Sequence, residues 1–159
     1  MKKYIFAVVS TIAVVIWIAV ILSNSAQTGV ESGSISKAVC EAINNFFNKL
    51  SLNITVSEHF VRKGAHFGEY AVLSLLVCAD VLSISELFEK MKGKWILLSM
   101  LLAIPVSAAV ALFDEFGVQM VTEGRGPSLR DVLIDTSGAV FGVFAVIFIL
   151  WICRAVRKR

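Results

Sequence analysis

Charge is scarce in this sequence. Only 17% of the 159 residues are charged, whereas 57% are hydrophobic, and the mean hydropathy is +0.81. A water-soluble domain of ordinary composition carries about 25% charged residues. The composition therefore excludes an ordinary soluble globular domain, and the length suits a single domain covering residues 1–159.

Motifs for several common chemistries are also missing. The only histidines are His59 and His66, and no Cys/His pattern has the spacing of a zinc site. The sequence has neither a phosphate-cradling P-loop nor a Gly-x-Ser-x-Gly nucleophile elbow. The three cysteines fall at different predicted depths, so we expect no internal disulfide. We predict no metal, no cofactor and no nucleic-acid partner.

Four long apolar runs dominate what is present. They cover about residues 4–22, 66–84, 95–113 and 132–153. Each is near the roughly 20 residues that a helix needs to cross a hydrocarbon core. A spanning segment must satisfy its backbone hydrogen bonds internally, and these lengths favour helices over strands. We therefore predict an all-α integral membrane protein with four transmembrane helices.

The first apolar run has features of a signal peptide as well as of an anchor. Lys2 and Lys3 precede it, and Ser25–Ala26 offers a cleavage site. Its apolar core is longer than the 7–15 residues usual in signal peptides, so we predict that it is retained.

Lys and Arg are distributed unevenly between the segments that connect the runs. Nine of the fifteen basic residues lie before run one, between runs two and three, or after run four. The positive-inside rule then places both termini and the loop between runs two and three in the cytoplasm. The two longer loops would face the cell exterior.

The first outer loop contains an amphipathic segment. Apolar residues recur at helical spacing over residues 35–50, with polar residues between them. This pattern predicts a helix that lies on the outer membrane surface. A helix packed over the outer mouth of the bundle fits the pattern equally well.

Two polar stretches adjoin the outer ends of the runs, and they carry the candidate site. In residues 62–70, Arg62, His66, Glu69 and Tyr70 recur at spacings of three or four, so they line one helix face. Gly64 and Gly68 would let another helix approach closely. Taken alone, the basic residues of this stretch are equally explained as interfacial anchors.

The second polar stretch covers residues 114–135. It contains a set of titratable and amide side chains, namely Asp114, Glu115, Gln119, Arg125, Arg130, Asp131 and Asp135. Gly138 and Gly142 extend the face of Asp131 and Asp135, which predicts that this face packs inward. Ionisable groups at a bilayer edge are costly if they face lipid, so the two stretches predict one shared polar site.

Two residues inside the runs call for structural interpretations. Pro105, midway along the third run, removes a backbone hydrogen bond and should kink that helix. Asp80 lies near the predicted cytoplasmic end of the second run, within reach of Lys90, Lys92 or Lys94.

Three stretches of the chain resemble the VanZ-like family of membrane proteins. They are a short polar motif at residues 25–32, a signature at residues 62–70, and a last motif containing Asp114-Glu115, Gln119, Gly124-Arg125 and 130–135. The chain departs from the family pattern at Gly117 and Val118, which add about one residue before Gln119. Which of Asp114 and Glu115 is the functional carboxylate is therefore open.

The resemblance implies a bacterial cytoplasmic-membrane protein linked to resistance to the glycopeptide teicoplanin. We expect an outward-facing site for an anionic or lipid-linked ligand, with membrane lipid, an envelope precursor or a glycopeptide as partner. Arg62, Arg125 and Arg130 would hold the anion, because a guanidinium matches phosphate or carboxylate.

Roles for the remaining candidates follow from their chemistry. Glu115 and His66 are the acid–base candidates, with Asp135 beside them in the catalytic set. Gln119, Glu69, Tyr70, Asp114 and Asp131 complete the predicted ligand-binding set. Alternative functions are a metal-independent enzyme acting on lipid-linked phosphates and a small, oligomeric proton-coupled transporter.

Overall fold

The computed structural model describes residues 2–87 and 93–157. Lys90 and Lys92, which the sequence offered as partners of Asp80, lie outside the described residues. Within the described part every regular element is helical and there is no strand. The all-α prediction is confirmed.

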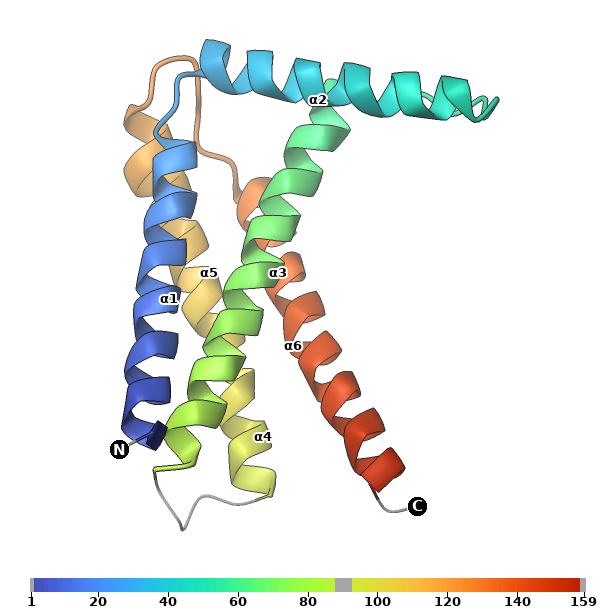
Figure 1. Ribbon diagram of the computed structural model, residues 1–159. Coiled ribbons are helices and arrows are strands. Elements are labelled where there is room, and N and C mark those ends of the chain that lie inside the picture. Colours follow the sequence, from blue (N-terminus) through green and yellow to red (C-terminus); the bar gives the residue numbers. More distant parts are fainter. Residues whose placement is uncertain (1, 88–92, 158–159) are drawn as a thin grey trace.

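Four stretches of helix are long and apolar enough to cross a membrane. They are α1 (Lys2–Ser25), α3 (Glu58–Ser85), the third span Lys94–Val121, and α6 (Leu129–Arg157). α1, α3 and the third span lie side by side, whereas α6 packs against α3 and diverges from α1 toward its C-terminal end (Figure 1). The start of α1 and the end of α6 are at the same end of the bundle. The predicted number of spans is confirmed, and each helix continues beyond its apolar run into polar sequence.

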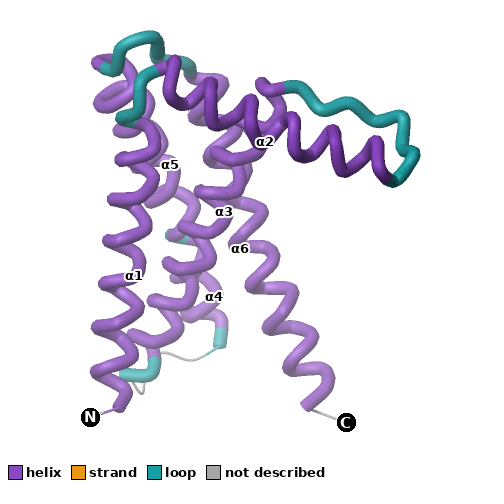
Figure 2. The backbone as a smooth tube through the Cα atoms, turned by 45° about the horizontal axis from the view of Figure 1, so that its top comes forward, coloured by secondary structure: helices purple, strands orange, loops and turns teal. Residues whose placement is uncertain are grey.

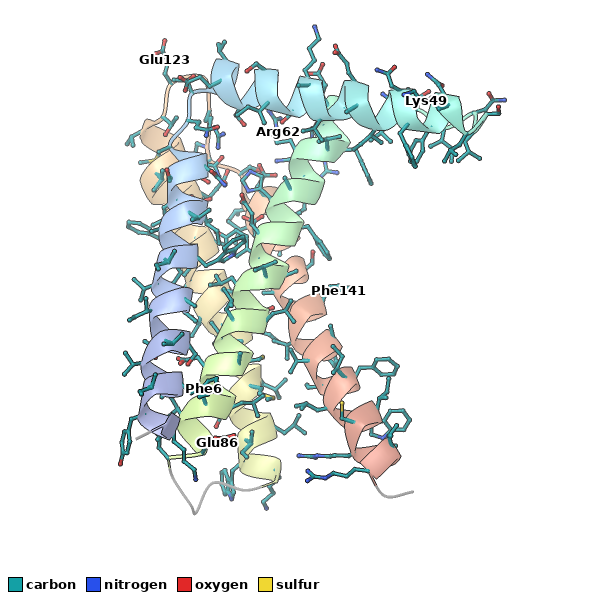
Figure 3. All side chains as sticks on the ribbon, in the orientation of Figure 1. Phe6, Lys49, Arg62, Glu86, Glu123 and Phe141 are labelled. Carbon is teal, nitrogen blue, oxygen red and sulfur yellow. The ribbon has the colours of Figure 1, made fainter. Side chains whose placement is uncertain are left out.

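The outside of the bundle is apolar along its length. Phe6 on α1 and Phe141 on α6 are 71% and 61% exposed. Side chains of this kind project outward from both helices (Figure 3). Exposed apolar surface of this extent is unfavourable in water and is expected against lipid. Together with the four spans, it identifies a membrane protein.

The third span is interrupted where Pro105 requires it. α4 (Lys94–Leu101) ends and α5 (Ala103–Phe113) begins on either side of Leu102. The proline ring clashes with the carbonyl group four residues earlier and offers no N–H to it. That carbonyl belongs to Leu101, the last residue of α4. The helix is thus interrupted one turn before the proline.

A further helix lies across one end of the bundle. α2 (Gly29–Lys49) runs nearly at right angles to the spans, at the end opposite both termini (Figures 1 and 2). The Thr28 hydroxyl accepts from the Glu31 backbone N–H, and the Glu31 carboxylate accepts from the Thr28 backbone N–H. This capping box fixes where α2 begins. Its position on a membrane surface stays a prediction.

Glycines decide which helix faces meet. A Cβ added at Gly138 would lie 2.2 Å from the Phe67 backbone oxygen, and one at Gly142 would lie 2.4 Å from that of Ala71. These two glycines let α3 and α6 pack at backbone contact, as predicted. The prediction for Gly64 and Gly68 is wrong, because a Cβ at either position would meet nothing within 4 Å.

The described partners of Asp80 lie on α1. Its carboxylate accepts hydrogen bonds from the Ser10 hydroxyl at 2.6 Å and the Thr11 hydroxyl at 2.9 Å. Asp80 therefore joins α3 to α1 near the end of the bundle that holds the termini. Among the described residues it makes no ion pair with Lys94.

Candidate functional site

Three carboxylates are completely buried near the end of the bundle that α2 crosses. Asp114 and Glu115 follow α5, and Asp135 lies two turns into α6; each is 0% exposed. Burial of a carboxylate is unfavourable unless hydrogen bonds or opposite charges compensate for it. The surroundings of these three groups therefore define the site.

A π-helical turn brings two adjacent carboxylates into the interior together. α5 widens at Asp114–Val118, where the Gln119 N–H donates to the Asp114 carbonyl five residues earlier. A π turn accommodates one extra residue within an α-helix and is frequent at functional sites. It includes Gly117 and Val118, the two residues before Gln119. Both Asp114 and Glu115 consequently point inward.

Gln119 connects these two carboxylates to an arginine. Its side-chain N–H group donates to Asp114 Oδ2 at 3.1 Å and to Glu115 Oε2 at 2.7 Å. Its oxygen accepts from Arg125 Nη1 at 3.3 Å. One amide thus satisfies two buried anions while a guanidinium polarises it from the other side.

Two further donors complete this arrangement. The Ser25 hydroxyl, at the end of α1, donates to Asp114 Oδ2 at 2.9 Å. The Ser128 backbone N–H donates to Glu115 Oε1 at 2.7 Å. Glu115 is therefore hydrogen-bonded through both oxygens, whereas Asp114 uses only one.

The third carboxylate, Asp135, is placed differently. His66 Nδ1 on α3 lies 3.8 Å from Asp135 Oδ1, which is too long for a hydrogen bond. Nearby, Lys63 and Asp131 form an ion pair between α3 and α6 at partly exposed positions. Lys63 thus belongs to the polar cluster, although its position next to Arg62 is equally typical of an interfacial anchor.

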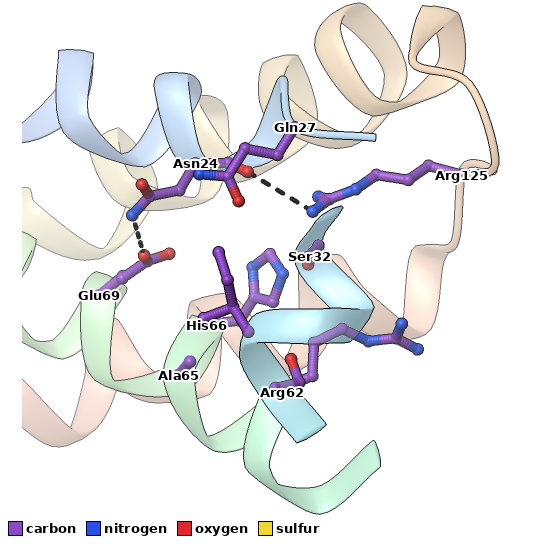
Figure 4. Close-up of a pocket in the computed structure, with 10 residues that line it drawn as sticks. Asn24, Gln27, Ser32, Arg62, Ala65, His66, Glu69 and Arg125 are labelled. Carbon is purple, nitrogen blue, oxygen red and sulfur yellow. Dashed lines mark hydrogen bonds between the residues drawn. The ribbon is translucent and has the colours of Figure 1, made fainter. Parts of the chain in front are cut away.

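Two adjoining cavities lie over the buried carboxylates. Their volumes are about 180 Å³ and about 150 Å³, and both are lined by Arg62, His66 and Arg125. Figure 4 shows the larger one, in which Asn24 donates to Glu69 Oε1 at 2.7 Å and its backbone oxygen accepts from Arg125 Nη2 at 3.5 Å. Residues of α1, α2, α3 and the 122–128 loop surround it.

Both guanidiniums of this pocket lack an acidic partner. Within the described part of the chain, neither Arg62 nor Arg125 has a carboxylate within 4 Å. Burial lowers the pKa of the Arg125 guanidinium below its ordinary value, and the Asp114 carboxylate opposes that change. A partly desolvated cation with neutral hydrogen-bond partners is suited to bind an anion.

The predicted site residues fall into three groups. Arg62, His66, Glu69, Arg125, Gln119 and Asp131 line one or both cavities. Asp114, Glu115 and Asp135 lie buried beneath them. Tyr70 packs against Ile21 and Leu73, and its buried hydroxyl has no hydrogen-bond partner among the described residues. Arg130 is exposed and lines neither cavity.

Neither Asn24 nor Ser25 was placed in the candidate site from the sequence. Both lie at the end of the first apolar run, where a polar turn was expected and no site residue. The available signal was the resemblance of residues 25–32 to a family motif. The structure explains part of that motif, because Gly29 contacts the Gly124 backbone, where a Cβ would lie 2.4 Å from the Gly124 oxygen.

Comparison with known proteins shows which family the chain belongs to. No curated protein and no solved structure matches the chain. The profile of the VanZ/LLP1 family matches residues 10–152, which include most of α1 and α6, the whole of α2, α3 and the third span, and every residue of the buried cluster. The chain therefore belongs to the VanZ/LLP1 family.

Proposed function

We propose that this protein binds an anionic, lipid-linked ligand of the bacterial cell envelope at the outer face of the cytoplasmic membrane, and that it thereby supports teicoplanin resistance. The observation that carries the proposal is the pocket bounded by Arg62 and Arg125, neither of which has a carboxylate partner among the described residues. A phosphate group would supply the missing negative charge.

The size of the pocket favours a headgroup over a whole glycopeptide. Its two parts, of about 180 and 150 Å³, are smaller than the roughly 300–1,000 Å³ clefts that enclose drug-sized ligands. A phosphate or sugar-phosphate headgroup suits such a volume, and its hydrocarbon chain would remain in the adjacent bilayer. The proposed link to teicoplanin therefore runs through an envelope lipid.

Orientation supports an extracellular pocket. Lys3, Arg154 and Arg157 are near the termini, at the end of the bundle opposite α2 and the pocket (Figure 1). The positive-inside rule assigns the end with the termini to the cytoplasm. Lys158 and Arg159, which extend the same charge pattern in the sequence, lie outside the described residues.

Burial favours binding over the catalytic alternative. Of the three predicted catalytic residues only His66 lines the pocket, whereas Glu115 and Asp135 are 0% exposed beneath it. Both Glu115 oxygens already accept hydrogen bonds. Glu115 is thus placed to stabilise the site rather than to exchange protons with a ligand.

Ligand binding by the purified protein tests the proposal. Three ligands would be titrated separately: a polyprenyl monophosphate, inorganic phosphate and teicoplanin, with the neutral polyprenol as control. We expect the polyprenyl phosphate to bind and the polyprenol to bind at least tenfold more weakly. Binding of inorganic phosphate alone would assign the pocket to a free anion, and binding of teicoplanin alone would contradict the lipid-linked ligand.

Variants identify the site. Arg125→Ala removes a charge-assisted contact of about 1.5–3 kcal/mol, which corresponds to a roughly 10–100-fold weaker affinity. Arg154→Ala is the matched control, because Arg154 is exposed at the other end of the bundle. Equal losses in both variants would contradict this assignment of the pocket.

A further inference from the structure

Three side chains from three different elements converge beneath the pocket. His66 comes from α3, Asp114 from the π turn after α5, and Asp135 from α6. One nitrogen or oxygen atom of each lies within 4.8 Å of the corresponding atoms of the other two. The residues are far apart in sequence, so only the folded bundle brings them together.

The converging atoms have no hydrogen-bond partners in the described structure. His66 Nδ1, Asp114 Oδ1 and both carboxylate oxygens of Asp135 are buried and unsatisfied. Asp114 and Asp135 are each 0% exposed, so bulk water does not reach them. Buried polar atoms are nearly always paired, and an unpaired carboxylate is among the least favourable groups to bury.

No neighbouring cation among the described residues pairs with the buried carboxyl groups of Asp114 and Asp135. Lys63 forms an ion pair with Asp131, and Arg125 donates to Gln119 and to the Asn24 backbone. Neither cation is within 4 Å of Asp114 or Asp135. The centre of the cluster therefore has carboxyl groups on two sides and, among the described residues, no cation between them.

The second oxygen of Asp114 is held in place from outside the cluster. Ser25 and Gln119 both donate to Oδ2, which leaves Oδ1 as the free atom. Hydrogen bonds to the outer atom of a carboxylate are the usual way in which proteins orient a metal ligand. This arrangement separates a supporting shell from a set of inner donor atoms.

We propose that His66, Asp114 and Asp135 bind a divalent transition metal of the zinc type. A nitrogen donor with two carboxylate oxygens suits such an ion, whereas magnesium and calcium prefer oxygen ligands alone. Ligand atoms around tetrahedral zinc lie about 3.4 Å apart at bond lengths near 2.1 Å. Side-chain movements of about 1 Å would bring the three atoms to that spacing.

Such a site would adjoin the anion pocket. His66 lines both cavities, and three protein ligands leave a fourth position for water or an anionic oxygen, as in catalytic zinc sites. The metal site does not depend on the proposed lipid ligand, because its donors are beneath the pocket rather than at its two arginines. It revises the expectation of no metal, which considered only spacing along the sequence.

Metal analysis of the purified protein tests the proposal. The untagged chain, in detergent, would be freed of metal with a chelator, titrated with Zn²⁺ by calorimetry, and analysed for bound metal by mass spectrometry. We expect one zinc ion per chain. X-ray absorption spectra at the zinc edge should show one nitrogen and at least two oxygen neighbours of the zinc ion at about 2.0–2.2 Å.

Matched variants separate this site from adventitious binding. Asp135→Asn and His66→Ala should each weaken zinc binding at least tenfold, whereas Asp80→Asn, a similar change at the Ser10–Thr11 contact, should leave it unchanged. Elution from a size-exclusion column as a single species is the check that each variant is folded. If Asp135→Asn fails this check, His66→Ala alone tests the proposal.

Two results would overturn the proposal. One is a wild-type protein that takes up no zinc. The other is wild-type affinity in both variants. A wild-type protein that binds zinc but not polyprenyl phosphate would refute the proposed function alone. A wild-type protein that binds polyprenyl phosphate but not zinc would refute the metal site alone.

Discussion

Gly138→Ala should damage both the fold and the pocket. The added Cβ would lie 2.2 Å from the Phe67 backbone oxygen, against about 3.4 Å for an ordinary contact. Because the obstacle is backbone, α3 and α6 must separate locally by about 1 Å. Phe67 follows His66 directly, and Asp135 is one turn before Gly138, so the separation would spread the cluster as well.

The magnitude follows from comparing two identical substitutions. Overpacking of this kind costs typically 1–3 kcal/mol. Replacing glycine by alanine within a helix also contributes a favourable propensity of about 0.8–1.0 kcal/mol. Gly64→Ala has the same propensity gain on α3 and meets nothing within 4 Å. The propensity therefore cancels, and Gly138→Ala should be about 1–3 kcal/mol less stable than Gly64→Ala.

Thermal unfolding in one detergent measures this difference, with single-species elution as the check on the starting state. We expect a midpoint several degrees lower for Gly138→Ala than for Gly64→Ala. Equal midpoints would refute the packing of α3 on α6 at backbone contact. A lower midpoint for Gly64→Ala than for Gly138→Ala would contradict the same packing.

The remaining predictions concern the supports of the cluster and of α2. Ser25→Ala removes one of two donors to Asp114 Oδ2 and should cost about 1 kcal/mol of unfolding free energy in detergent; an unchanged value would show that this contact is not formed. Gln119→Ala leaves Asp114 and Glu115 short of a donor and should cost more, about 1–3 kcal/mol, so a cost below that of Ser25→Ala would contradict the network. Thr28→Ala removes the cap of α2 and should cost about 0.5–2 kcal/mol locally, seen as faster amide exchange over the first turns of α2; unchanged exchange there would exclude the cap.

Much of the fold was readable from the sequence because lipid imposes a simple rule. A spanning helix must be about 20 residues long and apolar, so the four runs and their order could be predicted. A disturbance of the third span before Pro105 followed from the missing N–H group, and the break between α4 and α5 lies there. The ends of the spans were less visible, since α3 and α6 continue through charged residues, of which Asp135 is buried and Arg62 and Arg130 are exposed.

The sequence did not indicate which glycines mediate the packing of one helix against another. Gly64 and Gly68 have the same spacing as Gly138 and Gly142, and both pairs fit the rule for close helix contact. The choice depends on which side of α3 faces α6, and that is set by all the contacts of the bundle together.

The site was predictable as a pair of stretches but not residue by residue. Glu69 and Tyr70 were assigned to one face, yet adjacent helical residues are about 100° apart, and the structure places Glu69 at the pocket and Tyr70 in the core. The inward direction of both Asp114 and Glu115 depends on a π turn, which local sequence patterns do not indicate.

Teicoplanin susceptibility of bacteria that express this protein tests the central claim most directly. Wild type, Arg125→Ala and Arg154→Ala would be compared at equal membrane abundance. The account predicts that wild type and Arg154→Ala raise the inhibitory concentration and that Arg125→Ala does not. Full protection by Arg125→Ala would contradict a functional role for the anion pocket.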